Sequence, residues 1–174
     1  PHPRLLKDVD KESDLLFDFA RQQAVLEAAE GLLGKPALSL GVDYVENPKG
    51  SDASRLRQDH SMYQDHFGDE LALSLWIALD HTAPGRAMLE YGKPSPTQLL
   101  PHRSSLTTEA PLTLLDSTKF SLTEVHLPRG GCIAHHSYAA YRVGENRSDQ
   151  KWRAIAFRYR GSPYRSWLRL QTQG

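Results

Sequence analysis

The residues best suited to chemistry begin with a charged pair, Arg57 and Asp59, just before a long apolar run. In an extended chain, residues two positions apart point to the same face, with Cα atoms about 6–7 Å apart. A guanidinium and a carboxylate at that spacing can form an ion pair. Charged residues ahead of a strand also often belong to solvated turns. The pattern alone therefore leaves a functional pair and a solvated turn both open.

Two adjacent histidines, His135 and His136, follow a pair of glycines later in the chain. Adjacent residues of a strand point to opposite faces of the sheet. In simple extended geometry, both imidazoles therefore cannot bind one metal ion. The pattern predicts a structural role for at least one of them.

The elements that would position these residues start with a helix over residues 14–33, with Ser13 as its N-cap and Gly34 and Pro36 as its stop. Apolar residues recur on it every three or four positions, which predicts an amphipathic helix packed against a sheet. From residue 38 to 45 the pattern alternates, as is typical of a half-buried strand. Several short strands after one helix predict a mainly β chain, a jelly roll or a barrel. Further strands are predicted over 71–79, 87–91, 122–127, 132–139 and 152–159.

Composition excludes several classes of protein. The 174 residues include 21 Lys plus Arg and 21 Asp plus Glu, so nucleic acid is not predicted as a partner. The longest apolar run, 71–79, is far shorter than the roughly 20 residues of a membrane helix, so no membrane partner is predicted. A single cysteine, Cys132, fits a reducing compartment, and a cytoplasmic location is expected. We expect one domain over residues 1–174 that lacks its extreme N-terminal part, because the chain starts without Met.

Five short motifs follow one another in the order and spacing of a known family. With them, the stretch from residue 49 to 159 resembles the phytanoyl-CoA dioxygenase family of iron(II)- and 2-oxoglutarate-dependent oxygenases. The resemblance implies a double-stranded β-helix, or jelly roll, with an N-terminal flanking helix. It also implies a pocket for a small organic acid or a natural-product-like substrate. The motifs are Asn47-Pro48-Lys49, Gln58-Asp59-His60-Ser61-Met62-Tyr63, Trp76-Ile77-Ala78-Leu79-Asp80, Asn146-Arg147-Ser148-Asp149 and Arg153-Ala154-Ile155.

The departures from the family pattern fall on its iron ligands. Arg57 stands where the resemblance expects the first histidine, and Tyr141 stands where it expects the distal histidine. Asp59 alone remains of the ligand triad. His136 corresponds to a family histidine upstream of the distal ligand, which is not itself a ligand.

The position that would bind the cosubstrate is shifted as well. Counting from Tyr141 places Trp152 where the resemblance expects an arginine, and Arg153 follows one residue later. A lysine or arginine beside a phenol makes a suitable clamp for a carboxylate. We therefore predict that Lys49, Tyr63 and Arg153 bind the cosubstrate or another organic acid.

These replacements change what the site can hold. Iron(II) in such sites takes two imidazoles and a carboxylate, whereas Arg57 stays protonated and Tyr141 has an ordinary pKa of about 10. We therefore expect no metal and no cofactor, with Arg57 replacing the charge of the metal beside Asp59. The alternative keeps Fe(II) and 2-oxoglutarate through substitute ligands, in which Asp59 is joined by His60, His66 or His136.

Three functions remain open from the sequence. The first is a pocket protein with a degenerate iron site, either a non-redox isomerase or lyase, with Asp59 and Tyr141 as catalytic acid and base beside Arg57, or a binding protein. The second is an active Fe(II)/2-oxoglutarate-dependent hydroxylase with unorthodox ligands. The third is a non-catalytic scaffold that contacts an unknown protein partner through the polar, proline-containing excursion over residues 92–111.

Overall fold

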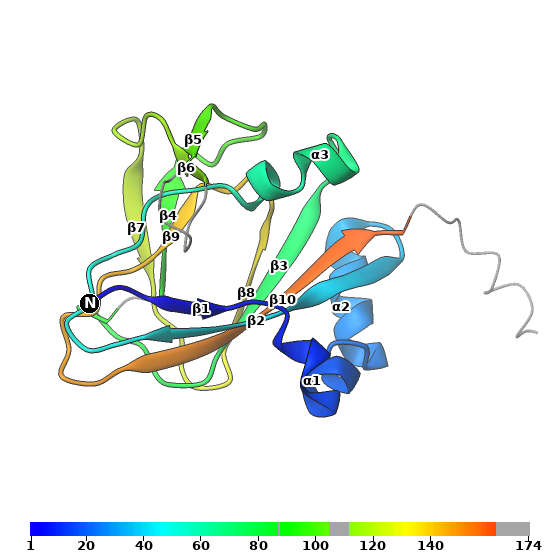
Figure 1. Ribbon diagram of the computed structural model, residues 1–174, viewed down its shortest axis with the longest axis horizontal. Helices are drawn as coiled ribbons and strands as arrows, with labels where there is room; N and C mark the ends of the chain where they lie inside the picture. Colours follow the sequence, from blue (N-terminus) through cyan, green and yellow to red (C-terminus); the bar gives the residue numbers. More distant parts are fainter. Residues whose placement is uncertain (87, 105–111, 163–174) are drawn as a thin grey trace, which may run out of the picture.

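Residues 1–86, 88–104 and 112–162 are described in this computed structural model, and within them the chain is mainly β (Figure 1). The helices are η1 (Val9–Lys11), α1 (Asp14–Phe19), α2 (Gln23–Leu33), η2 (Asp59–Met62) and α3 (Gln64–Phe67). The strands are β1 (Arg4–Leu6), β2 (Ala37–Asn47), β3 (Ala72–Ala78), β4 (Leu89–Lys93), β5 (His102–Ser104), β6 (Leu112–Leu114), β7 (Ser121–Val125), β8 (Cys132–His136), β9 (Tyr141–Val143) and β10 (Trp152–Gly161).

Two sheets enclose the main core. A five-stranded sheet has the order β1-β2-β10-β3-β8, and a three-stranded sheet has the order β7-β4-β9. Strands β5 and β6 form a separate pair. Buried side chains from both larger sheets pack together between them, among them Trp76, Met88, Tyr141 and Trp152. A second core lies between the five-stranded sheet and the N-terminal helices.

Strand β10 shows how period-two alternation serves both cores. Trp152, Ala154 and Ala156 point into the core between the sheets, whereas Phe157 and Tyr159 pack in the core under the helices. Because successive side chains of a strand point to opposite faces, one strand can supply both layers. A residue of β10 can thus be assigned to the inner or outer face by counting from Trp152.

The single helix predicted over residues 14–33 is two helices in the structure. Its predicted ends are confirmed, since the Ser13 hydroxyl accepts a hydrogen bond from the Leu16 amide at 3.4 Å and Gly34 has a φ of 70°. The break falls after α1, where the carbonyl of buried Ala20 accepts a hydrogen bond of 2.8 Å from the Tyr159 hydroxyl. In a continuous helix that carbonyl would accept the amide four residues later. The prediction was wrong here because a tertiary contact replaces the helical bond.

The predicted strands are present with shifted ends, and four strands were missed. Three of these, β1, β5 and β6, have three residues each, too few to show an alternating pattern, and β9 is as short. Strand β5 lies within the predicted surface excursion over 92–111, whose last residues, 105–111, lie outside the described part of the chain. The described helices include none that could cross a membrane.

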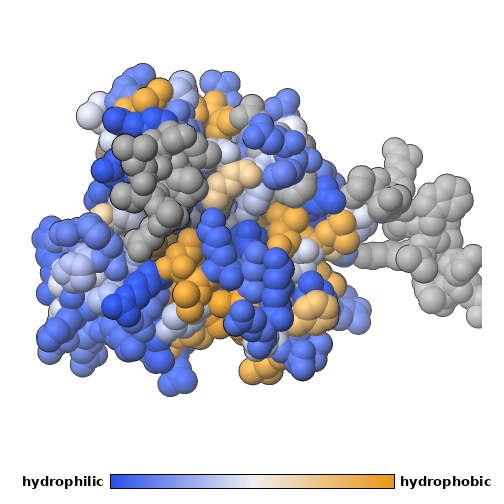
Figure 2. Space-filling model, viewed as in Figure 1, coloured by the Kyte–Doolittle hydropathy of each residue, from blue (hydrophilic) through white to orange (hydrophobic). Residues whose placement is uncertain are grey.

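The N-terminal helices also present apolar side chains to the surface. Large apolar side chains remain exposed on them, including Leu15 and Phe17 of α1 and Leu32 of α2. Figure 2 shows apolar side chains gathered toward the middle of one face, with hydrophilic side chains around them.

Candidate functional site

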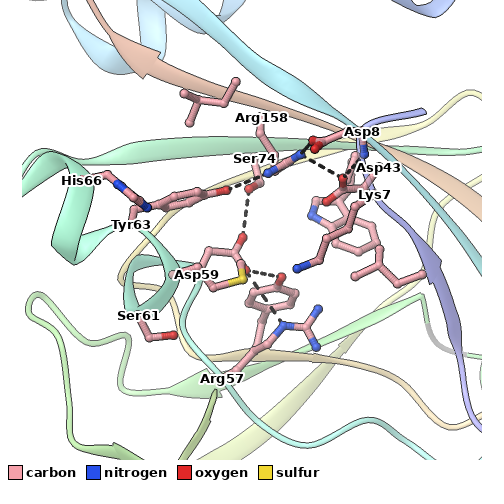
Figure 3. A pocket seen from close by; sticks show the side chains of 16 residues that line it. Lys7, Asp8, Asp43, Arg57, Asp59, Ser61, Tyr63, His66, Ser74 and Arg158 are labelled. Carbon is pink, nitrogen blue, oxygen red and sulfur yellow. Dashed lines mark hydrogen bonds and ion pairs between the residues drawn. The ribbon is translucent and has the colours of Figure 1, made fainter. Parts of the chain in front are cut away.

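A cavity of about 480 Å³ opens on the inner face of the five-stranded sheet (Figure 3). The N-terminal segment contributes Lys7 and Asp8 to its wall, and the segment around η2 contributes Arg57 and Asp59. Arg158 of β10 lines it from the sheet. The cavity thus collects charged side chains from three segments that are far apart in the sequence.

Strand register places a row of polar side chains across the floor of this region. Arg158 of β10 pairs with Ser74 of β3, and Ser74 pairs with His135 of β8. Residues directly opposite one another in neighbouring strands point to the same face. The row therefore presents a guanidinium, a hydroxyl and an imidazole side by side, and the hydroxyl of Ser74 and the imidazole of His135 reach Asp59.

The segment that carries Arg57 and Asp59 is fixed by its backbone and by one buried amide. The Arg57 and Tyr141 backbones exchange two hydrogen bonds of 2.9 Å, which sets their side chains next to each other. Fully buried Gln58 donates to the Gln98 carbonyl at 2.9 Å and to the Tyr138 carbonyl at 2.6 Å. These bonds hold the ends of the charged pair rigidly against the sheet.

Asp59 is buried and its carboxylate accepts hydrogen bonds at both oxygens. The Tyr141 hydroxyl donates to Oδ1 at 2.6 Å, and the Ser74 hydroxyl donates to Oδ2 at 3.0 Å. The His135 ring nitrogen Nε2 lies 3.4 Å from Oδ2, and the Arg57 Nε lies 4.0 Å from Oδ1. The predicted pairing of Arg57 with Asp59 is thus present as a close contact in a larger cluster. We call Arg57, Asp59, His135 and Tyr141 the charge cluster.

Burial and hydrogen bonding push the two acidic groups of the charge cluster apart. Burial by itself raises the pKa of Asp59, but the hydrogen bonds from His135 and Tyr141 and the charge of Arg57 outweigh it and leave that pKa well below its usual range. Burial raises the pKa of Tyr141 well above its ordinary value. Asp59 therefore stays ionised and Tyr141 stays protonated at neutral pH. The arrangement is better suited to holding a charge than to moving a proton.

His135 is the member of the charge cluster that was not predicted from the sequence. Its Nδ1 accepts a hydrogen bond of 2.7 Å from the Tyr91 hydroxyl in the tautomer that leaves Nε2–H to donate to Asp59. The predicted opposite orientation of the two histidines explains why His136 lies away from this cluster, where its ring accepts the Tyr138 amide at 3.2 Å. The sequence signal was available, because only one of the two could face the inner core.

The other histidines proposed as substitute ligands take different places. His60 is fully buried, with its ring bonded to the Ser137 hydroxyl at 3.0 Å and to the Gly68 carbonyl at 2.9 Å. Both ring nitrogens are therefore committed to holding the backbone. His66 lines the cavity.

Of the three residues predicted to bind an organic acid, the structure brings only Tyr63 to the cavity. Arg153 lies on the outer face of β10, where it forms two hydrogen bonds of 2.9 Å with Asp80. Lys49 is exposed in a turn. Arg158 lines the cavity instead, because it lies six residues after Trp152 and so shares its face. Arg153 is one residue after Trp152 and therefore points the other way.

Arg158 ties the N-terminal segment to the sheet. Its Nη2 contacts the Asp8 carboxylate at 2.5 Å and the Asp43 carboxylate at 3.0 Å, and its Nη1 donates to the Tyr63 hydroxyl at 3.4 Å. Burial raises the pKa of Tyr63 to about 12, so this phenol stays neutral. The network places one cation between two carboxylates on one side of the cavity.

The residues present do not fit iron(II) and 2-oxoglutarate in the manner that the family resemblance implies. Arg57 has no lone pair to offer a metal, and Tyr141 uses its proton to bond Asp59. Within the described residues, no three or more His, Cys, Asp or Glu side chains gather in a way that could hold a metal ion. Trp152, at the expected position of the cosubstrate arginine, is fully buried in the core between the sheets.

Comparison with solved structures shows the fold. A crystal structure of the epimerase SnoN from nogalamycin biosynthesis matches with a TM-score of 0.73 and 18% identity, over 90% of this chain and 62% of that chain. EvdO2 from Micromonospora carbonacea var. aurantiaca, complexed with 2-oxoglutarate, matches with a TM-score of 0.74 and 19% identity, over 94% of this chain and 69% of that chain. This chain therefore spans about two thirds of these proteins. No curated protein sequence gives a significant match.

The expectation of no cofactor is wrong for this fold. The EvdO2 structure holds 2-oxoglutarate, and a second SnoN structure is a complex with Fe3+, alpha ketoglutarate and nogalamycin RO. That second structure matches with a TM-score of 0.71 and 18% identity, over 99% of this chain and 71% of that chain. Proteins with a similar fold therefore bind iron and 2-oxoglutarate, the two groups that the sequence analysis kept only as its alternative.

The family itself follows from a direct sequence match. The sequence model of the family described as phytanoyl-CoA dioxygenase (PhyH) matches residues 3–155 of this chain. This range is most of the chain and includes the charge cluster and most of the cavity wall. The chain belongs to the phytanoyl-CoA dioxygenase family.

Proposed function

We propose that this protein is a small-molecule binding protein built on the double-stranded β-helix of its family, with the iron-ligand positions converted into a fixed charge cluster. Its ligand is a small organic acid or a natural-product-like molecule that enters the cavity beside Asp59. The observation that carries the proposal is the Arg57 guanidinium, which lies 4.0 Å from Asp59 Oδ1 at the position of the family's first histidine.

The charge of Arg57 accounts for the survival of a buried carboxylate at this position. An isolated buried carboxylate is costly, and a nearby cation offsets the cost only if hydrogen bonds satisfy the remaining lone pairs. Asp59 has both the cation and the bonds from Ser74 and Tyr141. A guanidinium is always charged, so it can supply permanently the positive charge that a metal would otherwise supply.

Binding is favoured over acid–base catalysis by Asp59 and Tyr141. A general acid or base works best with a pKa near the operating pH. The pKa of Asp59 is lowered and that of Tyr141 is raised, so both move away from neutrality. The cavity of about 480 Å³ is nevertheless large enough for a small ligand.

A second candidate function is an active iron(II)- and 2-oxoglutarate-dependent hydroxylase with unorthodox ligands. It is supported by His135, whose Nε2 lies 3.4 Å from Asp59 Oδ2 and so places an imidazole beside the carboxylate. An imidazole and a carboxylate, two kinds of ligand that iron(II) accepts, would then lie next to each other. In the first candidate the charge of Arg57 takes the place of a metal ion. In the second, a metal ion binds although Arg57 lies beside it.

Metal affinity separates them. We expect the Arg57→His/Tyr141→His variant to bind Co(II) at least about 100-fold more tightly than the wild type in anaerobic titrations. Two unit charges 4 Å apart interact by about 4 kcal/mol at an effective dielectric constant of about 20, so removing the guanidinium alone accounts for a factor of this size. The measurement is calorimetric or follows the visible bands of Co(II).

Arg153→His is the matched control, because it adds a histidine at a surface arginine outside the cavity. It should leave Co(II) affinity at the wild-type level. Arg57→His alone provides a second test if the double variant does not fold. Wild-type affinity equal to that of the variants, together with its loss in His135→Ala, would reject the charge cluster and establish the hydroxylase ligands.

A further inference from the structure

The carboxylates of the cavity are already satisfied by protein groups. Asp8 contacts Lys11 at 3.0 Å and Arg158 at 2.5 Å, and Asp43 contacts Arg158 at 3.0 Å. Asp59 accepts hydrogen bonds from Ser74 and Tyr141 and forms an ion pair with Arg57. The negative charges therefore need no cation from a ligand.

Three cations, Lys7, Arg57 and Arg158, line the cavity beside the three carboxylates, and because Lys11, outside the lining, pairs with Asp8, one lining cation is left over. Lys7 lines the cavity and, within the described part of the chain, forms no ion pair. Arg57 forms one ion pair among the described residues, with Asp59 at 4.0 Å through Nε, and its guanidinium carbon lies 4.9 Å from the centre of the Tyr141 ring. Figure 3 shows the Lys7 ammonium and the terminal nitrogens of Arg57 directed into the same part of the cavity. This part of the cavity has room for one further negative charge.

Two buried N–H donors that belong to cavity-lining residues also lack an acceptor. They are the indole Nε1 of Trp76 and the Nε of Arg158, for which no described group is within hydrogen-bonding distance. Trp76 is only 3% exposed, so bulk water does not satisfy its indole directly. Buried polar groups in native proteins are nearly always paired, so each of these donors needs an acceptor, which a water molecule or a ligand in the cavity can supply.

We propose that Lys7 and Arg57 form a clamp for a carboxylate of the ligand, with the Trp76 indole N–H as an additional donor at the cavity wall. This inference rests on the proposed binding function and names its ligand class, an organic acid that is negatively charged at neutral pH. Leu5, Leu40 and Ala156 line the same cavity and would contact the carbon skeleton of the acid. A lysine and an arginine acting together bind a carboxylate through charge-assisted hydrogen bonds.

The clamp can be tested with succinate and its neutral analogue succinamide as probes. Binding is followed by NMR through the indole N–H signal of Trp76, identified among the three tryptophans by Trp76→Phe. We expect succinate to shift this signal and succinamide to bind at least tenfold more weakly. Lys7→Met should weaken succinate binding about tenfold or more, the amount usual for losing one charge-assisted hydrogen bond.

Lys49→Met is the matched control, because Lys49 is exposed and lies outside the cavity lining. It should leave succinate affinity unchanged. The clamp is refuted if succinamide binds as tightly as succinate, if Lys7→Met binds normally, or if succinate leaves the Trp76 signal in place up to tens of millimolar. The Co(II) comparison uses no carboxylate ligand, so a failed clamp and a failed charge cluster give separate results.

Discussion

Replacing Asp59 by asparagine is expected to lower the free energy of unfolding at neutral pH by about 3–5 kcal/mol, the cost of breaking a buried ion pair from one side. The Arg57 side chain is 14% exposed and that of Asp59 is 5% exposed, so water cannot replace the lost partner. The substitution leaves the guanidinium buried beside a neutral amide. Chemical denaturation of the wild type and the variant measures the difference.

A double-mutant cycle shows whether the loss comes from the pair. Arg57→Met alone should also be strongly destabilising, because it leaves the Asp59 charge without its cation. The variant with both changes should be destabilised by clearly less than the sum of the single effects. Asp149→Asn, at an exposed position, is the matched control and should be near neutral. Additive single effects would show that Arg57 and Asp59 do not interact.

The effect of Asp59 has a definite dependence on pH. Because the pKa of Asp59 is lowered in the folded state, the unfolded chain takes up the proton first as the pH falls. The stabilisation is therefore complete above the unfolded pKa of about 4 and is lost progressively below it. We expect the stability gap between wild type and Asp59→Asn to narrow on acidification. A constant gap down to strongly acidic pH would show that Asp59 is not held as a carboxylate.

Gly41→Ala is expected to lower the free energy of unfolding by about 2–4 kcal/mol, from backbone strain and overpacking together. Gly41 has a φ of 135°, which side-chain-bearing residues rarely adopt. An added Cβ would also lie 2.8 Å from Asp8 Oδ1 and 2.9 Å from Arg158 Nη2. The glycine thus lets the ion pair between the N-terminal segment and β10 cross the strand.

Gly31→Ala is the matched control for this prediction. Gly31 lies inside α2, and a Cβ there would meet nothing within 4 Å. The change should raise the free energy of unfolding by about 0.5–1 kcal/mol, because alanine loses less conformational freedom in a helix. Thermal and chemical unfolding of both variants should therefore shift in opposite directions. A neutral Gly41→Ala would mean that the ion pair does not pass so close to the backbone.

The sequence by itself determined the local features of this protein. Alternation predicted β2, a near-continuous apolar run predicted β3, and the cap at Ser13 and the glycine at 34 predicted the ends of the helical region. The motif order indicated the family, which the match over residues 3–155 confirms. These features depend on residues close together in the chain, so they can be read from spacing and residue type alone.

Only the tertiary structure decided which residues meet at the site. His135 reaches Asp59 from 76 positions away because β8 pairs with β3 in a register that sets it opposite Ser74. Arg158 rather than Arg153 faces the cavity, because a strand reverses its side chains at every residue and an error of one position changes the face. Alternation divides each strand into two faces, but it contains no information about which strands become neighbours or which face turns inward. That choice is made by the packing of the whole sheet, and it settled where the charges of this cavity lie.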